Sequence, residues 1–343
     1  MASMKDVSRA CGVSIATVSK ALNDQGDIGE ETKKRIRRIA REMGYFPNSQ
    51  ARALKTNRTH NIGVLFVDAA NSGLTHSYFS SVLDSFKRTV EEKGYDITFI
   101  NGSDKGRKQL SILEHCRFRG FDGVVIACVD FEDPQVVELA KSGFPVVTID
   151  YLFDNGIAVM SDNAKGMRDL VTYIYERGHR KIAYLHGADS SVTQKRVASF
   201  YRTAAELGLF IPDEFVREVP YRHIAMAESA TKELLQLKDR PTCILYPDDY
   251  SCIGGINAIR ELGLRIPEDV SLAGYDGISI GRQLEPKLTT IRQDTQRLGS
   301  EAAKRLISLI ENPKSALSDT VMVGGILYTG GTVGLLRQSG HSL

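Results

Sequence analysis

From residue 61 onward, the sequence alternates short apolar runs with stretches whose apolar residues recur at helical spacing. Residues 79–90 show the helical spacing clearly, because their apolar side chains fall on one face. Parallel strands connected through helices form sheets that are covered on both faces. The apolar runs are residues 62–67, 96–100, 123–128, 145–150, 181–186, 243–246 and 270–275. This alternation predicts an α/β fold with parallel sheets.

The apolar runs fall into two sets, which predicts two lobes within residues 61–335. Two later segments, residues 294–311 and 320–328, are expected to cross back between the lobes. The predicted lobes are about 61–160 with 294–320, and about 162–290 with 322–335. Residues 336–343 remain as a tail.

The start of the chain is basic, whereas the rest of its 343 residues are mildly acidic. Residues 1–60 hold 12 Lys and Arg against 6 Asp and Glu, and the remainder holds 32 against 36. This asymmetry favours a polyanionic partner for the basic segment alone. No apolar run approaches the ~18 residues that span a bilayer, and the N-terminus lacks an apolar signal segment. We therefore expect a cytoplasmic protein without a membrane partner.

The basic segment has the pattern of three short helices. Ser3 and Asp6 have the spacing of a capping box, and Gly12 can end the helix that they start. Ser14 can cap a second helix, and a third is predicted over residues 30–43. Two short helices joined by a glycine-containing turn form the helix-turn-helix pattern. The sequence therefore predicts a small all-α head.

The second predicted helix opens with small and hydroxyl-bearing side chains, which permit a close approach to DNA. Its exposed candidates are Ser14, Ile15, Ala16, Thr17, Ser19 and Lys20. Hydroxyl groups can donate to phosphates, small apolar groups can face base edges, and a lysine can reach guanine or a phosphate. A small helical bundle with a solvated basic face is the alternative interpretation.

Two stretches of the sequence resemble one family in order and spacing. They are KDVSRACGVSIATVSKALN (residues 5–23) and GYFPNSQARALKTNRTHNIGV (residues 44–64). Both resemble the lactose-repressor family of bacterial transcription regulators, and the body resembles the same family to near residue 335. The resemblance implies a helix-turn-helix DNA-binding head over residues 1–46 and a two-lobed core similar to periplasmic sugar-binding proteins. Lys20 stands where many members have arginine, which leaves its bidentate contact with guanine open.

Residues 47–60 are predicted to form a hinge between the head and the core. After Pro47 the chain can form about two helical turns capped by Asn48, with Ala51 and Leu54 on one face. The resemblance implies that Leu54 enters the minor groove at the centre of the operator, where an apolar wedge unstacks a base step. The residues predicted to contact DNA are Lys5, Ser14, Ile15, Ala16, Thr17, Ser19, Lys20, Asn23, Asn48, Ala51, Leu54 and Lys55.

Polar residues follow several predicted strands, where ligands of open α/β sheets bind. Carboxylates at such positions suit a polyhydroxylated ligand, since each accepts hydroxyl hydrogen bonds. Taken singly, each of these residues is also a common helix cap or turn residue. The resemblance implies an effector site of Asp150, Arg196, Tyr221, Asp248, Asp276 and Gln293. Asn71 and Phe79 follow the first predicted strand and are expected to line the same site. Arg196 is the only cation in this set against three carboxylates, which favours a neutral or amino-bearing sugar-like ligand.

The sequence contains no complete match to a common catalytic motif. GISIG (residues 277–281) has the spacing of a nucleophile elbow, but Pro286 interrupts the helix that should follow. The only later histidine is His341, near the end of the chain. The sequence contains no glycine-rich phosphate loop, no H-E-x-x-H and no C-x-x-C pair. We therefore expect no catalytic activity, no cofactor and no metal site.

These features together predict a ligand-responsive, sequence-specific repressor. Two helix-turn-helix heads need two half-sites, so we expect a symmetric homodimer on a pseudopalindromic DNA operator. Residues 336–343 contain no leucine-rich segment like the tetramerising tail of the lactose repressor, which favours a dimer. Control by a protein co-regulator instead of a small molecule is one alternative. A solute-binding protein without DNA function is a remote one, because it would lack the head.

Overall fold

The computed structural model describes residues 2–46, 58–68, 73–100, 110–313 and 319–336. The chain divides into two compact units, Met1–Asn61 and Ile62–Leu343. Within the described ranges, no helix is both long enough and apolar enough to cross a membrane.

Residues 2–46, the described start of the first unit, form a bundle of three helices. They are α1 (Met4–Cys11), α2 (Ile15–Leu22) and α3 (Glu30–Glu42). A capping box starts α1, because the Ser3 hydroxyl accepts from the Asp6 N–H at 3.3 Å and the Asp6 carboxylate accepts from the Ser3 N–H at 3.0 Å. Gly12 ends α1 in the left-handed conformation (φ 64°) that glycine adopts at little cost. The buried core is Val7, Cys11, Val18, Ala21, Ile36 and Ala40. The predicted helix-turn-helix head is confirmed.

The first lobe of the second unit is built on a six-stranded sheet of order β11-β5-β4-β3-β1-β2. Its strands are β1 (Asn61–Phe66), β2 (Asp96–Ile100), β3 (Gly123–Ala127), β4 (Val146–Ile149), β5 (Ile157–Ser161) and β11 (Asp319–Val323). The pairs β1–β3, β3–β4, β4–β5 and β5–β11 are parallel. The carboxyl ends of these five strands therefore share one edge of the sheet.

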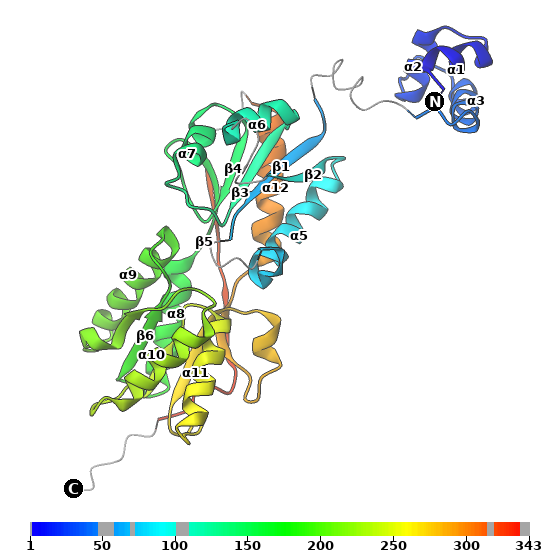
Figure 1. Cartoon of the computed structure of the whole chain (residues 1–343). Coiled ribbons are helices and arrows are strands. Elements are labelled where there is room, and N and C mark those ends of the chain that lie inside the picture. The colour runs from blue at the N-terminus through cyan, green and yellow to red at the C-terminus, as the bar shows by residue number, and fades with distance from the viewer. Residues whose placement is uncertain (1, 47–57, 69–72, 101–109, 314–318, 337–343) are drawn as a thin grey trace. The chain divides into compact units, whose positions relative to one another are not determined.

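Helices cover both faces of this sheet (Figure 1). The helices α5 (Ser77–Glu91) and α12 (Thr295–Glu311) pack together on one face, and α6 (Ile112–Arg119) and α7 (Pro134–Lys141) cover the other. The predicted apolar face of α5 is buried against the sheet and α12. Gly299 of α12 permits close contact of the two helices, since a Cβ there would lie 2.2 Å from the carbonyl oxygen of Val82.

The second lobe repeats this plan with a sheet of order β12-β10-β9-β8-β6-β7. Its strands are β6 (Ile182–His186), β7 (Val216–Glu218), β8 (Cys243–Leu245), β9 (Ser271–Asp276), β10 (Thr289–Arg292) and β12 (Ile326–Tyr328). The edge strand β12 is antiparallel to β10, and the other pairs are parallel. On one face lie α8 (Asn163–Glu176) and α9 (Ser191–Glu206), and on the other α10 (Ile224–Gln236) and α11 (Asp249–Glu261) (Figure 1). The predicted two-lobed α/β core is confirmed.

The chain passes between the lobes three times. The passages follow β5 at Asp162, β10 at residues 293–294, and β11 at residues 324–325. The segment predicted as one strand-like unit, residues 320–328, is two strands in different sheets, because Gly324 and Gly325 separate them and glycine weakens a strand. The lobe boundary predicted at residues 320–322 therefore falls inside β11, which pairs with β5 through Val323.

Candidate functional site

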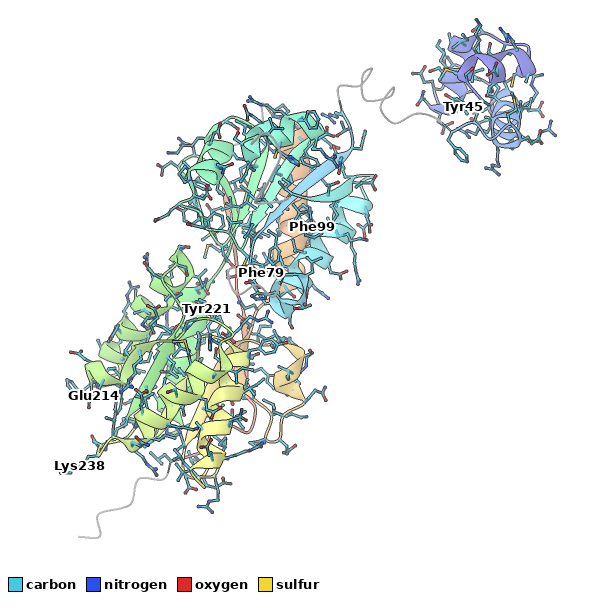
Figure 2. All side chains as sticks on the ribbon, viewed as in Figure 1. Tyr45, Phe79, Phe99, Glu214, Tyr221 and Lys238 are labelled. Atoms are coloured by element: carbon cyan, nitrogen blue, oxygen red, sulfur yellow. The ribbon has the colours of Figure 1, made fainter. Side chains whose placement is uncertain are left out.

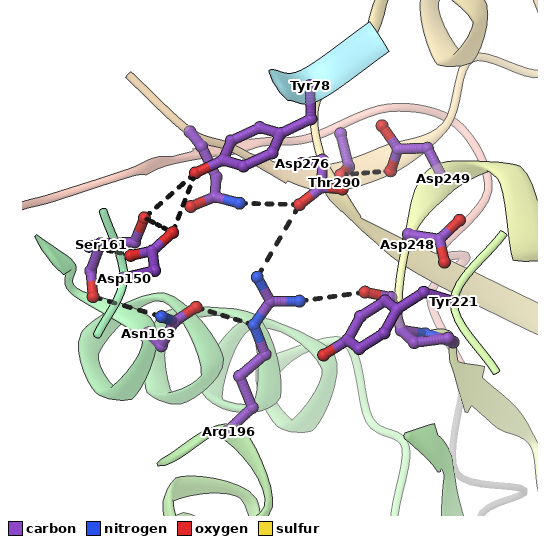
Figure 3. Close-up of polar contacts among 12 residues, drawn as sticks. Tyr78, Asp150, Ser161, Asn163, Arg196, Tyr221, Asp248, Asp249, Asp276 and Thr290 are labelled. Atoms are coloured by element: carbon purple, nitrogen blue, oxygen red, sulfur yellow. Dashed lines mark hydrogen bonds and ion pairs between the residues drawn. The ribbon is translucent and has the colours of Figure 1, made fainter. Parts of the chain in front are cut away.

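Arg196, on α9, is held in one position by four neighbours (Figure 3). Its Nε donates to Asn163 Oδ1 at 2.7 Å, and its Nη1 donates to the carbonyl oxygen of Pro247 at 3.0 Å. Its Nη2 lies 3.8 Å from Asp276 Oδ1, and its guanidinium carbon lies 3.6 Å from the centre of the Tyr275 ring. The side chain is buried. Because the guanidinium is planar and always charged, these contacts make it a preoriented donor beside the Asp276 carboxylate.

Asp276 ends β9 and brings a carboxylate to the carboxyl edge of the second sheet. Gln293 Nε2 donates to its Oδ1 at 2.7 Å. The pKa of this carboxyl is raised to about 6. Burial is the largest cause and the charge of Asp248 adds to it, whereas the charge of Arg196 lowers the pKa. The backbone of Asp276 has φ 101°, a conformation that costs a non-glycine residue about 1–3 kcal/mol. The surrounding contacts therefore hold a strained carboxylate in place, and it is mostly ionised at pH 7.

The raised pKa of Asp276 predicts a pH-dependent contribution to stability. Its folded value of about 6 exceeds the ordinary 3.8, so the folded protein binds this proton more tightly than the unfolded chain. The contribution is fully present below about pH 4 and is lost as pH rises through 6, by at most about 3 kcal/mol. Urea unfolding of wild type and Asp276→Asn from pH 4 to pH 7 measures it. We expect the variant to gain stability relative to wild type with rising pH, and parallel curves would contradict this.

Asp150 follows β4 and lies in a buried network of the first lobe (Figure 3). Its Oδ1 accepts from the Ser161 N–H at 2.6 Å, and its Oδ2 accepts from the Tyr78 hydroxyl at 3.3 Å and the Ser161 hydroxyl at 3.2 Å. The Ser191 hydroxyl of the second lobe donates to the Asp150 carbonyl at 3.0 Å. The carboxylate is therefore oriented by its own lobe, while the backbone of the same residue contacts the other lobe.

The neighbouring aspartates Asp248 and Asp249 have structural partners of their own. Asp248 caps α11, since its Oδ1 accepts from the Ser251 N–H at 2.8 Å, and its Oδ2 accepts from the Arg222 N–H at 2.7 Å. Asp249 accepts from the Ile278 N–H at 2.8 Å, and burial raises its pKa well above the ordinary value. Asp248 thus meets the alternative expectation of a helix cap. Asp249 fixes the GISIG stretch as a loop with one short 3₁₀ turn, η3 (Ser279–Arg282).

The two predicted aromatic residues, Phe79 and Tyr221, lie one in each lobe (Figure 2). Tyr221 lies between β7 and α10, and its hydroxyl is 2.8 Å from Thr193 Oγ1. The Tyr221 ring fits because residue 187 is Gly187, where a Cβ would lie 2.0 Å from a ring carbon. Phe79, in the first turn of α5, contacts Tyr78 with ring centres 4.9 Å apart. Aromatic faces of this kind can stack on the apolar face of a sugar ring.

The head exposes the start of α2. The Ser14 hydroxyl caps the helix by accepting from the Thr17 N–H at 3.0 Å. Ile15 is 47% exposed, and Ala16 is exposed beside it. The exposed edge of this helix is therefore small, partly apolar and bordered by hydroxyl groups, which suits insertion into a major groove.

Of the other residues predicted to contact DNA, some have partners within the head and one is exposed to solvent. Lys20 pairs with Asp27, and Asn23 Nδ2 donates to the Ser19 carbonyl at 2.7 Å. Lys5 is exposed on α1. An exposed ion pair stabilises a protein by only about 0–1 kcal/mol. Lys20 can therefore exchange Asp27 for a phosphate or a guanine of DNA at a small cost in free energy.

The chain matches known proteins along most of its length. Residues 3–48 match the bacterial regulatory proteins of the lacI family, and residues 171–333 match the periplasmic binding protein-like domain. Over 320 residues, the chain is 31% identical to the HTH-type transcriptional repressor PurR of Pectobacterium carotovorum subsp. carotovorum (strain PC1), covering 92% of each protein. The chain belongs to the lacI family of bacterial regulatory proteins. The family consists of transcriptional regulators, and another relative is the probable HTH-type transcriptional repressor ExuR of Bacillus subtilis (strain 168), at 27% identity over 92% of this chain and 93% of ExuR.

Solved structures of lacI-family proteins have the same fold. The Lac repressor dimer bound to operator and the anti-inducer ONPF has a TM-score of 0.81 at 24% identity, covering 97% of this chain and 99% of that one. The complex of the transcriptional regulator CelR with cellobiose has a TM-score of 0.70 at 22% identity, covering 97% and 100%. A regulator from Enterococcus faecium with bound ribose has a TM-score of 0.68 at 24% identity, covering 81% and 100%.

Several residues of this candidate site were not selected from the sequence. Asn163 and Tyr275 hold Arg196, and Ser161 holds Asp150. Ser161 and Asn163 flank the first passage between the lobes, and this position is the only local signal that the sequence offers for them. Five of the predicted contact residues lie outside the described part of the chain: Asn48, Ala51, Leu54, Lys55 and Asn71.

Proposed function

We propose that this lacI-family protein is a cytoplasmic repressor that binds a pseudopalindromic operator as a homodimer. Its operator affinity is controlled by a small sugar-like effector bound between the two lobes. The observation that carries the proposal is the preoriented Arg196 beside the Asp276 carboxylate, which together offer fixed donors and acceptors at a strand edge. Two structures of the same fold that contain cellobiose and ribose support the ligand class. PurR and ExuR, both named as repressors, support the direction of control.

The aromatic residues and the carboxylates contact different parts of the proposed effector. Phe79 and Tyr221 stack on the ring faces, and Asp150 and Asp276 accept hydroxyl hydrogen bonds. Arg196 donates to ring or hydroxyl oxygens. Three carboxylates and one cation in the predicted set favour a neutral or amino-bearing ligand. Asp248 contributes through its cap of α11 and its contact with the Arg222 N–H, which position the loop beside Tyr221.

The proposed domain organisation links this ligand to DNA. The head, residues 1–46, lays α2 in the major groove, and residues 47–60 form the hinge. The described lobes touch at the Ser77 hydroxyl and the Tyr250 hydroxyl, 3.1 Å apart, so a ligand that changes the lobe arrangement must alter such contacts. Effector and operator affinities are then reciprocally coupled, typically by about 1–3 kcal/mol.

The test is an operator titration in the presence of candidate ligands. Operator sites are first selected from random double-stranded DNA with the full-length protein. DNA affinity is then measured against a panel of neutral sugars, amino sugars, sugar acids and nucleosides. We expect a change of roughly 5–150-fold for at least one neutral or amino sugar. DNA binding without any ligand response would favour control by a protein co-regulator, and failure to select any DNA would overturn the repressor proposal.

Leu54 is proposed to act as an apolar wedge in the minor groove. We expect Leu54→Ala to weaken operator binding by about tenfold or more, because the kink in the operator loses the side chain that supports it. Ligand binding should stay unchanged, since the substitution lies in the hinge. Leu262→Ala, at a half-exposed leucine after α11, is the matched control. Fluorescence anisotropy with labelled operator measures both, and equal affinity of Leu54→Ala and wild type would exclude the wedge.

A further inference from the structure

Three side chains with different metal-binding atoms meet at the carboxyl edge of the first sheet. Asp68 follows β1, Cys128 follows the neighbouring strand β3, and His76 caps α5. One ligand atom from each residue lies within 4.8 Å of the other two, and all three residues are half-buried. We propose that Asp68, His76 and Cys128 form a binding site for a divalent metal ion of the zinc type. The proposal does not depend on the identity of any effector.

The set of ligand atoms selects the class of metal. Zinc is bound by thiolate sulfur, imidazole nitrogen and carboxylate oxygen at about 2.0–2.3 Å, which places tetrahedral ligand atoms roughly 3.5 Å apart. The three ligand atoms already lie within 4.8 Å of one another, so metal binding requires each pair to approach by at most about 1.3 Å. Magnesium and calcium prefer oxygen ligands alone, so a site with sulfur and nitrogen discriminates against both.

The local structure leaves these side chains accessible to a metal. Cys128 is the one cysteine of the five, all of them in described segments, that is not buried. His76 Nδ1 accepts a hydrogen bond from the Phe79 N–H at 3.5 Å. Because this hydrogen bond is long and therefore weak, the imidazole can rotate towards a metal ion at little cost in free energy. The Phe79 ring packs against the imidazole with centres 5.0 Å apart and limits the directions in which it can turn.

The charges of the residues around the site are compatible with a divalent metal ion that has three protein ligands and an open fourth coordination position. A thiolate and a carboxylate neutralise a divalent ion, so the nearby Arg222 of the second lobe does not oppose binding. The charge of Arg222 acts on both His76 and Cys128, and its guanidinium lies over the Tyr250 ring at 4.5 Å. Arg222 Nη1 is buried without a hydrogen-bond partner among the described residues. An oxygen ligand in the fourth metal position, such as a water molecule, would supply an acceptor for it.

Cobalt(II) provides the direct test, because it replaces zinc and reports thiolate ligation by absorption. The metal-free full-length protein is titrated with cobalt and then with zinc. We expect one cobalt per chain, visible bands of tetrahedral cobalt, a near-ultraviolet thiolate-to-cobalt band, and loss of all bands on addition of zinc. Wild-type protein without a thiolate-to-cobalt band would overturn the proposal.

Three variants and one control locate the site. Cys128→Ser should abolish the thiolate band, whereas Cys11→Ser in the head should keep it. His76→Asn retains a residue that can cap α5, and Asp68→Asn retains the side-chain shape; each should weaken zinc binding at least tenfold. Circular dichroism confirms that each variant is folded, and if Cys128→Ser is not, the other two variants decide. A thiolate band that survives in folded Cys128→Ser, or unchanged zinc affinity in both other variants, would show that the metal binds elsewhere.

Discussion

Replacing Arg196 with methionine is expected to lower the free energy of unfolding by about 3–5 kcal/mol and to remove binding of the proposed effector. The reason is that Arg196 is buried and paired with a buried carboxylate, and removal of one partner leaves the other charge uncompensated. The Asn163 side-chain oxygen and the Pro247 carbonyl would also lose their donors. Lysine cannot restore these contacts, because one ammonium group cannot reach all three acceptors.

Urea unfolding of the full-length protein measures the loss. Arg202→Met, on the exposed side of the same helix, is the matched control and should change stability by less than about 0.5 kcal/mol. Ligand binding is followed by a thermal-shift panel of the sugars used in the operator titration. If Arg196→Met were as stable as wild type, the guanidinium would not be needed to compensate the Asp276 carboxylate, and the description of the site would be wrong.

Substitution of Gly299 by alanine should destabilise the first lobe by about 3 kcal/mol. The added Cβ would lie 2.2 Å from the Val82 carbonyl oxygen and 2.7 Å from the Phe86 nitrogen. Both atoms belong to the backbone of α5, so no side-chain rotation relieves the clash and the two helices must separate. Separation opens gaps in the core beneath them, which adds to the cost of overpacking.

Gly324→Ala is the matched control for this change. A Cβ at residue 324 meets no atom of the described residues within 4 Å, and the residue does not require a left-handed backbone. We therefore expect a change of less than about 0.5 kcal/mol. Thermal unfolding monitored by circular dichroism distinguishes the two variants, and equal melting temperatures would mean that α5 and α12 can separate without loss.

Periodicity and turn residues were enough to predict the head and the two-lobed plan. Three strands were not predicted: β5, β7 and β10. The short β7 (Val216–Glu218) carries two charged residues, and β10 (Thr289–Arg292) contains two threonines and an arginine. Their hydrophobicity alone does not distinguish them from loops. β10 is buried by packing against β9 and β12, which only the tertiary structure reveals.

The candidate site could be predicted only in part. Asp150, Arg196 and Asp276 were chosen through the family resemblance, and the structure gives each of them several fixed partners. The same reasoning could not separate Asp248, whose oxygens cap a helix, from Asp249, which holds a loop. Adjacent aspartates look alike in sequence, and their hydrogen-bond partners come from residues 3–41 positions away. The metal-ligand cluster has no sequence signature either, because its members follow different elements.

The position of α12 in the chain determines when the first lobe can fold during synthesis. Residues of α12, such as Leu298, Ala302 and Leu306, belong to the apolar core around β1, β3 and β4, yet they are translated long after those strands. The edge strand β11 arrives later still. A nascent chain that ends before residue 295 therefore leaves part of one apolar face of this sheet uncovered by α12, while the strands β6 to β10 of the second lobe are being made. Whereas the head can fold as soon as it emerges, the first lobe must wait for the last part of the chain.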